Sequence, residues 1–242
     1  MDAQMTFKRY ELKYMLSRRQ TAELKEAMEG HLALDQFGHS VIRNIYFDTD
    51  NFRLVRRSLE KPLYKEKLRV RSYQKATEYS PVFVELKKKY DGVVYKRRLQ
   101  LPHRQAMDAL ESGAPLPAEG QIAREIEAFR RFYGPTLGPA MALSYEREAF
   151  YPVDGTDFRL TLDENLLWRT DRPDLSSSCR GRLILPRETV LMELKTPGGI
   201  PLWMVKFLSE RQIRQVSVSK YGLAYQQMVT ENRVENKIIR IA

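Results

Sequence analysis

The chain has 242 residues, with 41 Lys and Arg against 31 Asp and Glu, and a formal net charge of +10. This length can bury the core of one large domain, and the charge indicates either a phosphate-rich or otherwise acidic partner or a basic surface with no specific partner. No apolar run is long enough to cross a bilayer or to act as a secretion signal, and the single cysteine, Cys179, excludes an internal disulfide. We therefore expect a cytoplasmic protein that reaches a membrane only through a partner.

The first half of the chain alternates between strand and helix patterns. Residues 6–15 alternate as a strand, and Ser17 with Gln20 is a capping-box signal for an amphipathic helix that continues through Leu32. Asp91-Gly92 is a strong hairpin signal between two basic strands. The other elements predicted here are strands over 41–48, 64–73, 82–89 and 93–101 and a short helix over 52–58.

The second half repeats this mixture. Helical spacing of apolar residues covers 103–111 and 119–133, and strand alternation returns over 140–151, 158–163 and 189–195. Two further helices are predicted over 201–211 and 219–230. Together the elements predict one many-stranded antiparallel α+β domain that spans residues 1–242.

Charged residues recur at alternate positions of these strands, so each strand gathers them on one face. A solvated outer face explains any one such strand. Their repetition favours a closed sheet that aims the charges at a shared lumen, and such a lumen implies a bound polyanion. The cations on these faces are Lys67, Arg69, Arg71, Lys87, Lys89, Lys96, Arg98, Arg147 and Arg159.

Acidic residues on the same faces allow two interpretations. Glu11, Glu85, Asp163 and Glu193 could balance the cations as ion pairs, or one or two of them could hold a divalent metal together with substrate phosphates. Glu193 is the preferred metal ligand because apolar residues of its strand surround it, namely Val190, Leu191, Met192 and Leu194. A salt bridge to a lysine of the lumen is the alternative for each acid.

The last predicted helix begins at Ser219-Lys220. The free N–H groups and the dipole of a helix N-terminus bind phosphate, whereas the simpler interpretation is that Ser219 only caps the helix.

Eight short motifs occur along nearly the whole chain: Glu11-Leu12-Lys13, Tyr46-Phe47-Asp48-Thr49, Leu68-Arg69-Val70-Arg71, Val84-Glu85-Leu86-Lys87, residues 145–150, residues 159–163, residues 192–195 and Ser219-Lys220-Tyr221. In their order and strand placement they resemble the VTC domain, the polyphosphate polymerase domain of the triphosphate tunnel metalloenzyme superfamily. The resemblance implies a closed antiparallel β-barrel with a charged lumen and flanking helices. It also implies that the lumen binds nucleoside triphosphate with Mn²⁺ or Mg²⁺ and transfers the terminal phosphate to a growing polyphosphate chain.

The resemblance also implies roles for particular residues. Glu193 would bind the metal, and the catalytic residues would be Lys87, Arg147, Glu193 and Lys220. The substrate-binding residues would be Lys13, Arg69, Arg71, Lys87, Lys96, Tyr145, Arg147, Arg159, Ser219 and Lys220. Two departures stand out: Glu11-x-Lys13 replaces the Glu-x-Glu pair of wider relatives, and Ser217 stands where the eukaryotic polymerase has a further lysine.

The leading functional hypothesis is a metal-dependent phosphotransferase that synthesises polyphosphate from ATP. Hydrolysis of triphosphate or polyphosphate in the same tunnel and non-catalytic binding of these ligands are the alternatives. Nucleic acid is not expected as a partner, because the chain has no helix-turn-helix or zinc pattern and its basic residues alternate along strands.

Overall fold

The computed structural model describes residues 10–91 and 93–239, with the side chains of the last helix described as far as residue 232. Its strands are β1 (Tyr10–Ser17), β2 (Leu32–Thr49), β3 (Tyr64–Ser72), β4 (Pro81–Tyr90), β5 (Val93–Pro102), β6 (Leu137–Pro152), β7 (Arg159–Arg169), β8 (Arg182–Leu183), β9 (Thr189–Thr196) and β10 (Gln215–Val216). Its helices are α1 (Arg18–Ala27), α2 (Arg53–Leu59), α3 (His103–Ser112), α4 (Gln121–Tyr133), the 3₁₀ turn η1 (Gly134–Thr136), α5 (Leu202–Glu210) and α6 (Lys220–Ile239).

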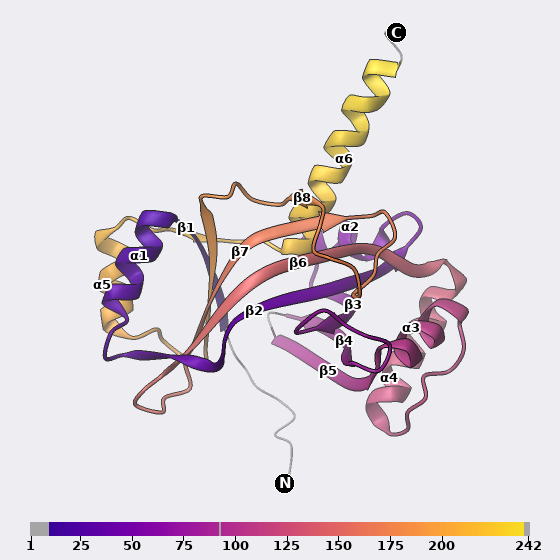
Figure 1. The fold of residues 1–242 in the computed structure, drawn as a ribbon, viewed down its shortest axis with the longest axis horizontal. Helices are drawn as coiled ribbons and strands as arrows, with labels where there is room; N and C mark the ends of the chain where they lie inside the picture. The colour runs from indigo at the N-terminus through magenta and orange to yellow at the C-terminus, as the bar shows by residue number, and fades with distance from the viewer. Residues whose placement is uncertain (1–9, 92, 240–242) are drawn as a thin grey trace.

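The strands form one antiparallel sheet in the order β10-β1-β9-β7-β6-β2-β3-β4-β5, with β8 paired to β7 (Figure 1). The predicted α+β class is confirmed, but the prediction of a closed barrel is wrong, because no pairing joins β5 to β10 within the described residues. The sheet is nevertheless curled, since Lys87 on β4 lies 3.3 Å from Glu11 on β1 across its concave face. The two residues of β10 offer too few backbone groups to hold another strand, and the chain then enters α6.

Strand alternation separates apolar from charged side chains on the two faces of the sheet. On the convex face, Leu68, Val84 and Leu101 pack with α3 and α4 in one core cluster. Leu16 and Met192 pack with α1 and α5 in a second cluster. Figure 1 shows these two helix pairs at opposite ends of the molecule. Because helices cover the apolar face of the sheet, the charged residues at alternate strand positions lie on its concave face.

Asp48 at the end of β2 joins α2 and α6 to the sheet. Its Oδ1 accepts hydrogen bonds from the backbone N–H groups of Thr49 and Leu54, both at 2.8 Å. Its Oδ2 accepts from the N–H of Val55 at 3.0 Å and from the hydroxyl of Tyr221 at 2.9 Å. The Tyr221 ring stacks on Tyr46 with a centroid distance of 4.3 Å. These contacts fix the start of α6 against the concave face.

Most predicted elements appear within a few residues of their expected limits. The capping box of Ser17 and Gln20 is present, but α1 ends at Ala27 and Leu32 begins β2, because the chain pairs there with the end of β6. The two-residue strands β8 and β10 were not predicted, since such short pieces have no periodicity. Gly92 of the expected hairpin and residues 6–9 of the first predicted strand lie outside the described residues. Among the described helices, none is both long and apolar enough to cross a bilayer.

Candidate functional site

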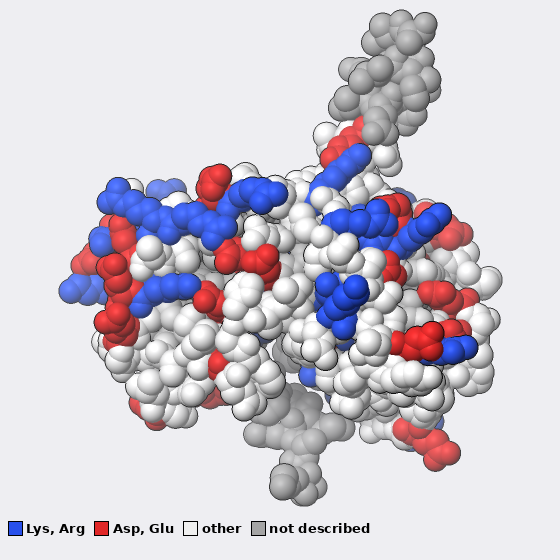
Figure 2. Space-filling model, viewed as in Figure 1, with Lys and Arg blue, Asp and Glu red and all other residues white. Residues whose placement is uncertain are grey.

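The concave face of the sheet contains a cavity of about 750 Å³. Eleven Lys and Arg and five Asp and Glu line it, a surplus of six positive charges in a chain whose formal surplus is ten. On the face shown in Figure 2, by contrast, basic side chains lie beside acidic ones at both ends of the molecule. We call this cavity the basic pocket; its charged residues are Glu11, Lys13, Lys61, Lys65, Glu66, Lys67, Arg69, Arg71, Glu85, Lys87, Lys89, Asp91, Arg147, Glu193, Lys195 and Lys220.

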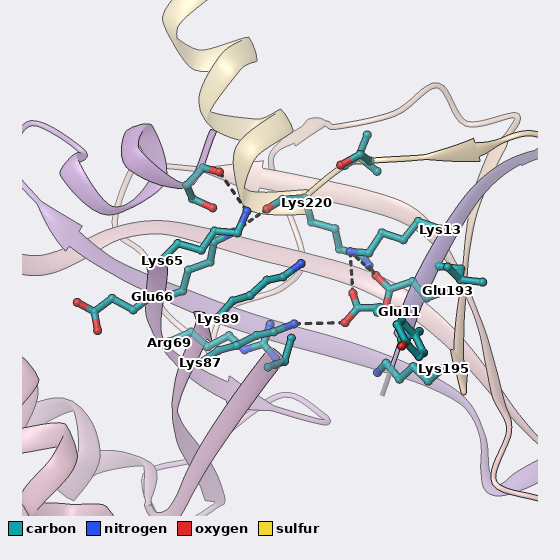
Figure 3. Close-up of a pocket in the computed structure, with 18 of the residues that line it drawn as sticks. Glu11, Lys13, Lys65, Glu66, Arg69, Lys87, Lys89, Glu193, Lys195 and Lys220 are labelled. Carbon is teal, nitrogen blue, oxygen red and sulfur yellow. Dashed lines mark hydrogen bonds and ion pairs between the residues drawn. The ribbon is translucent and has the colours of Figure 1, made fainter. Parts of the chain in front are cut away.

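The strand register brings these side chains together. Lys13 on β1 is the direct cross-strand partner of Glu193 on β9, and Lys67 on β3 is the partner of Lys87 on β4. Each pair belongs to one wall of the pocket, and the 3.3 Å contact of Lys87 with Glu11 shows that the two walls face each other. Figure 3 shows Lys65, Arg69, Lys87 and Lys89 on one wall, Glu11, Lys13, Glu193 and Lys195 on the other, and Lys220 entering from the start of α6.

Glu193 is the centre of an ion-pair network. Its Oε1 lies 2.7 Å from Lys220 Nζ and 3.3 Å from Lys13 Nζ, and its Oε2 lies 3.6 Å from Arg147 Nη2. Arg147 also makes a bidentate pair with Asp163, at 2.5 and 2.6 Å. Burial would raise the pKa of Glu193, but Lys220, Lys13 and Arg147 hold it well below its ordinary value. Glu193 is therefore an ionised carboxylate surrounded by cations.

A second network surrounds Glu85, which is only 1% exposed. Its Oε2 accepts from Arg69 Nε at 2.8 Å, and its Oε1 accepts from Arg98 Nε at 2.8 Å and lies 2.6 Å from Lys96 Nζ. Burial opposes ionisation, yet Arg69 and Arg71 and then Lys96 keep the pKa of Glu85 far below its usual range. This acid fixes the cations of β3 and β5 in one arrangement.

Two tyrosines connect these networks. The Tyr46 hydroxyl accepts from Arg69 and the Tyr145 hydroxyl accepts from Arg71, each at 3.0 Å. Lys220 Nζ lies 4.8 Å from the centre of the Tyr145 ring, a cation–π contact. Burial would raise the pKa of Tyr46, but Arg69 and Arg71 lower it below its ordinary value. Both hydroxyls thus lie in a strongly positive part of the pocket.

Other cations of the pocket have no acidic partner. Within the described part of the chain, Lys65, Lys67, Lys89 and Lys195 contact no carboxylate. Lys65 Nζ donates to the backbone oxygen of Ser58 at 3.3 Å, and Lys67 Nζ lies 2.8 Å from Ser219 Oγ. Burial, with the charges of neighbouring lysines, lowers the pKa of Lys67 to about 7. Burial also lowers the pKa of Lys195, to about 8, although Glu193 and Glu11 oppose it.

Most residues predicted from the sequence lie in the pocket wall. They are Lys13, Arg69, Arg71, Lys87, Tyr145, Arg147, Glu193, Ser219 and Lys220. Lys96 does not line the pocket but is attached to it through Glu85. Arg159 is not among the residues that line the pocket. It is the first residue of β7 and the cross-strand partner of the wall residue Lys195, and its side chain is 57% exposed and 3.5 Å from Asp35.

The predicted substrate-binding set leaves out several wall residues. The prediction places Lys67 and Lys89 on the charged strand faces but gives them no role. Lys65 and Lys195 share the same alternate strand positions, and this periodicity could have identified them. Tyr46 was noticed only as part of a motif, because a tyrosine in an apolar strand has no distinctive signal. The structure shows the place of its hydroxyl in the site, because Arg69 of β3 donates a hydrogen bond to it.

The oxygen donors of the pocket suit a hard divalent cation. Glu11 Oε1 and Glu193 Oε1 both contact Lys13 Nζ, at 2.9 and 3.3 Å, so the two carboxylates lie close together on neighbouring strands. Mg²⁺ and Mn²⁺ are commonly held by one or two carboxylates, with substrate phosphates and water as the other ligands. The residues present therefore fit such an ion, although Lys13 already forms ion pairs with both carboxylates.

Another group of possible metal ligands lies outside the basic pocket. One ligand atom each of His39, Glu146 and Glu164 lies within 4.8 Å of the others, on adjacent strands β2, β6 and β7. Arg18 already pairs with Glu164, and His39 Nε2 lies 3.2 Å from Glu146 Oε2. These contacts account for the group without a metal ion.

Comparison with known proteins identifies the family and the fold of the chain. The profile of the VTC domain matches residues 8–229, whereas no curated protein sequence matches the chain. A candidate adenylate cyclase from Bacillus halodurans superposes with a TM-score of 0.54 at 20% identity, over 86% of this chain and 92% of that one. A candidate adenylyl cyclase from Hippeastrum, described as having a dominant triphosphatase activity, superposes with a TM-score of 0.54 at 17% identity, over 90% and 96% of the two chains. At these identities the likeness concerns the fold alone.

Proposed function

The chain belongs to the VTC domain family, and we propose that it is a metal-dependent phosphotransferase that makes polyphosphate from ATP in the basic pocket. The observation that carries this proposal is the surplus of six positive charges on the pocket wall. Burying so many like charges together is unfavourable unless a polyanion neutralises them. A triphosphate or a polyphosphate chain supplies that charge in an extended form that suits two facing walls.

The wall residues would act by positioning and neutralising phosphates. Phosphoryl transfer needs little covalent chemistry from the protein, because most of the catalytic effect comes from alignment and charge stabilisation. Arg69, Arg71 and Arg147 would each hold phosphate oxygens with their planar forks. Lys87 from β4 and Lys220 from the start of α6 would neutralise the charge that develops on the transferred group. Tyr145, Lys13 and Ser219 would complete the substrate contacts.

Glu193 would be the principal ligand of Mn²⁺ or Mg²⁺, and Glu11 offers a second carboxylate beside it. When bound, the ion would neutralise phosphate charge and align the phosphate oxygens. The chain's own contribution is to keep both acids ionised, which the depressed pKa values of Glu11 and Glu193 support. Lys13 would move between the carboxylates and the substrate as the charge of the site changes.

Hydrolysis is the second candidate function. In the same pocket it would need only that water replaces the acceptor phosphate. Among the described residues no pairing between β5 and β10 closes the sheet, which favours this alternative because water could enter a lumen that is not closed. The triphosphatase activity named for the Hippeastrum protein is of this kind. A binding module without turnover is the remaining alternative.

Incubation with ATP and Mn²⁺, followed by electrophoresis of the products, separates these possibilities. The proposal predicts long polyphosphate and ADP. Free phosphate alone would assign the chain as a hydrolase. Tight binding of tripolyphosphate with no product would make it a binding module, and neither binding nor product would overturn the functional assignment of the basic pocket.

A further inference from the structure

Lys67 and Ser219 form a pair inside the basic pocket. Lys67 Nζ lies 2.8 Å from Ser219 Oγ, although the two residues are 152 positions apart in the chain. Ser219 Oγ also accepts a hydrogen bond from the backbone N–H of Gly222 at 3.2 Å, as a helix cap does. A cap needs only this second bond. The contact with Lys67 is therefore an additional feature that capping does not explain.

The surroundings of Lys67 favour loss of its proton. The four charged groups that act most strongly on it are all positive: Lys87 on β4, Lys13 on β1, and Lys65 and Arg69 on β3. No carboxylate contacts Lys67 within the described residues, and burial with these charges lowers its pKa to about 7. A neutral amine at this distance can accept the proton of a hydroxyl. Serine beside a neutral lysine is one of the known arrangements that activate a serine nucleophile.

We propose that Ser219 is a phosphoryl acceptor whose hydroxyl is activated by Lys67, so that the pocket phosphorylates its own serine. The inference rests on the proposed phosphoryl transfer from ATP. Ser219 Oγ attacks the γ-phosphorus, the Oγ–P bond forms and the bond from the γ-phosphorus to the bridging oxygen breaks. The hydroxyl proton passes to Lys67 Nζ, and ADP leaves with the bond electrons.

The position of Ser219 suits the phosphoserine that this step produces. The residue directly precedes α6, and free N–H groups and the dipole at a helix N-terminus stabilise a phosphate. Lys65, Lys67 and Lys220 provide positive charge around the same end of the pocket. The phosphoserine would therefore be held in the pocket. A further phosphate could be added to it there, so that the phosphoserine is the first acceptor of a polyphosphate chain.

The test is to incubate the full chain with ATP and Mn²⁺, quench with acid and map phosphopeptides. Acid removes phosphate bound to lysine or to another phosphate, whereas phosphoserine survives. We expect acid-stable phosphate on Ser219 and none in Ser219→Ala. Ser17→Ala is the matched control, because Ser17 caps α1 in the same way but lies outside the pocket. Ser17→Ala should keep the modification on Ser219.

The lysine is tested by the initial rate of Ser219 phosphorylation. Lys67→Arg is permanently protonated near neutral pH and cannot accept a proton, and the rate should fall on the order of 100-fold. Lys206→Arg, on the exposed side of α5, should leave it unchanged. In the native chain the rate should rise with pH through and above 7, and Lys67→Arg should lose that rise. Lys195, with a pKa of about 8, also lines the pocket. The increase of the rate with pH is therefore assigned to Lys67 only if Lys67→Arg abolishes this increase.

Each result decides the inference. Absence of phosphoserine at position 219 overturns the inference about Ser219 in every case. If ADP is released in the same sample, the proposed function stands without this inference. Phosphoserine that forms equally fast in Lys67→Arg overturns the role of the lysine. If Ser17→Ala and Ser219→Ala behave alike, Ser219 is only a helix cap.

Discussion

At Glu193, cations from three other elements meet one carboxylate. Lys220 comes from α6, Lys13 from β1 and Arg147 from β6, and each lies within 3.6 Å of a carboxylate oxygen. Under the proposed function the residue would do two things at once. It would offer oxygen to a divalent ion, and it would hold the cations of the pocket in position before substrate arrives. A neutral amide at this position keeps the shape but loses both functions.

We expect Glu193→Gln to lower ATP turnover on the order of 100-fold, as the loss of a preorganised charge at a phosphoryl-transfer site does. The concentration of Mn²⁺ needed for half-maximal rate should also rise. Titration of Mn²⁺ against initial rate measures both effects. Glu146→Gln is the matched control, since Glu146 is on the same sheet but outside the pocket. Undiminished turnover of Glu193→Gln at the native Mn²⁺ requirement would contradict the assignment.

Among the elements, α6 depends most clearly on a single side chain elsewhere. Asp48 on β2 accepts three backbone N–H groups around the start of α2 and the hydroxyl of Tyr221 in α6. It is only 2% exposed, so these donors have no access to water as a substitute. Through Tyr221 it sets the place of Ser219 and Lys220 in the pocket. Asp48 is thus a positioning residue for the site.

Replacing Asp48 should reveal this dependence in the free energy of unfolding. We expect Asp48→Ala to cost about 3 kcal/mol, because it leaves several buried donors without an acceptor. Tyr221→Phe removes only one of the four hydrogen bonds and should cost about 1 kcal/mol. Urea denaturation followed by circular dichroism measures both. If Asp48→Ala and Tyr221→Phe lose the same free energy of unfolding, the hydrogen bond from the Tyr221 hydroxyl accounts for the effect of Asp48, and the hydrogen bonds from the backbone N–H groups around α2 do not.

For the whole molecule, the concentration of cations in one pocket makes stability depend on pH. The pKa values of Lys67 and Lys96 are lowered to about 7 and that of Lys195 to about 8, chiefly by burial. In the unfolded chain these lysines titrate near 10.5. Between these values the unfolded state binds more protons than the folded state, so stability rises with pH. The depressed pKa values of Glu11, Glu85 and Glu193 act only in acid, where their contribution is lost as they become protonated.

The melting temperature of the free protein should therefore increase from pH 7 to about pH 9 at low salt. Tripolyphosphate should raise the melting temperature, and its effect should be larger at pH 7, where more of these lysines are charged. Scanning fluorimetry with and without this ligand tests both statements. A melting temperature that falls over the same range without ligand would contradict the lowered pKa values.

The sequence by itself determined which charged side chains share a strand face. Alternation is local, so Glu11 with Lys13 and Arg69 with Arg71 follow from neighbouring residues alone. The same alternation placed Arg147 and Glu193 on charged strand faces, and the family motifs implied roles for them and for Lys220. The main helices and the antiparallel α+β class followed for the same reason, because periodicity and capping depend on a few consecutive residues.

Only the tertiary structure decided which of these faces meet. The contacts of Lys67 with Ser219 and of Lys87 with Glu11 join residues 152 and 76 positions apart, and no local pattern specifies such pairs. The lack of pairing between β5 and β10 in the described part of the chain and the exposed position of Arg159 also depend on how far the sheet curls. Curvature and register arise from packing of the whole core, whereas alternation arises from each strand alone. The charges were therefore evident in the sequence, but their arrangement into one pocket was a result of folding.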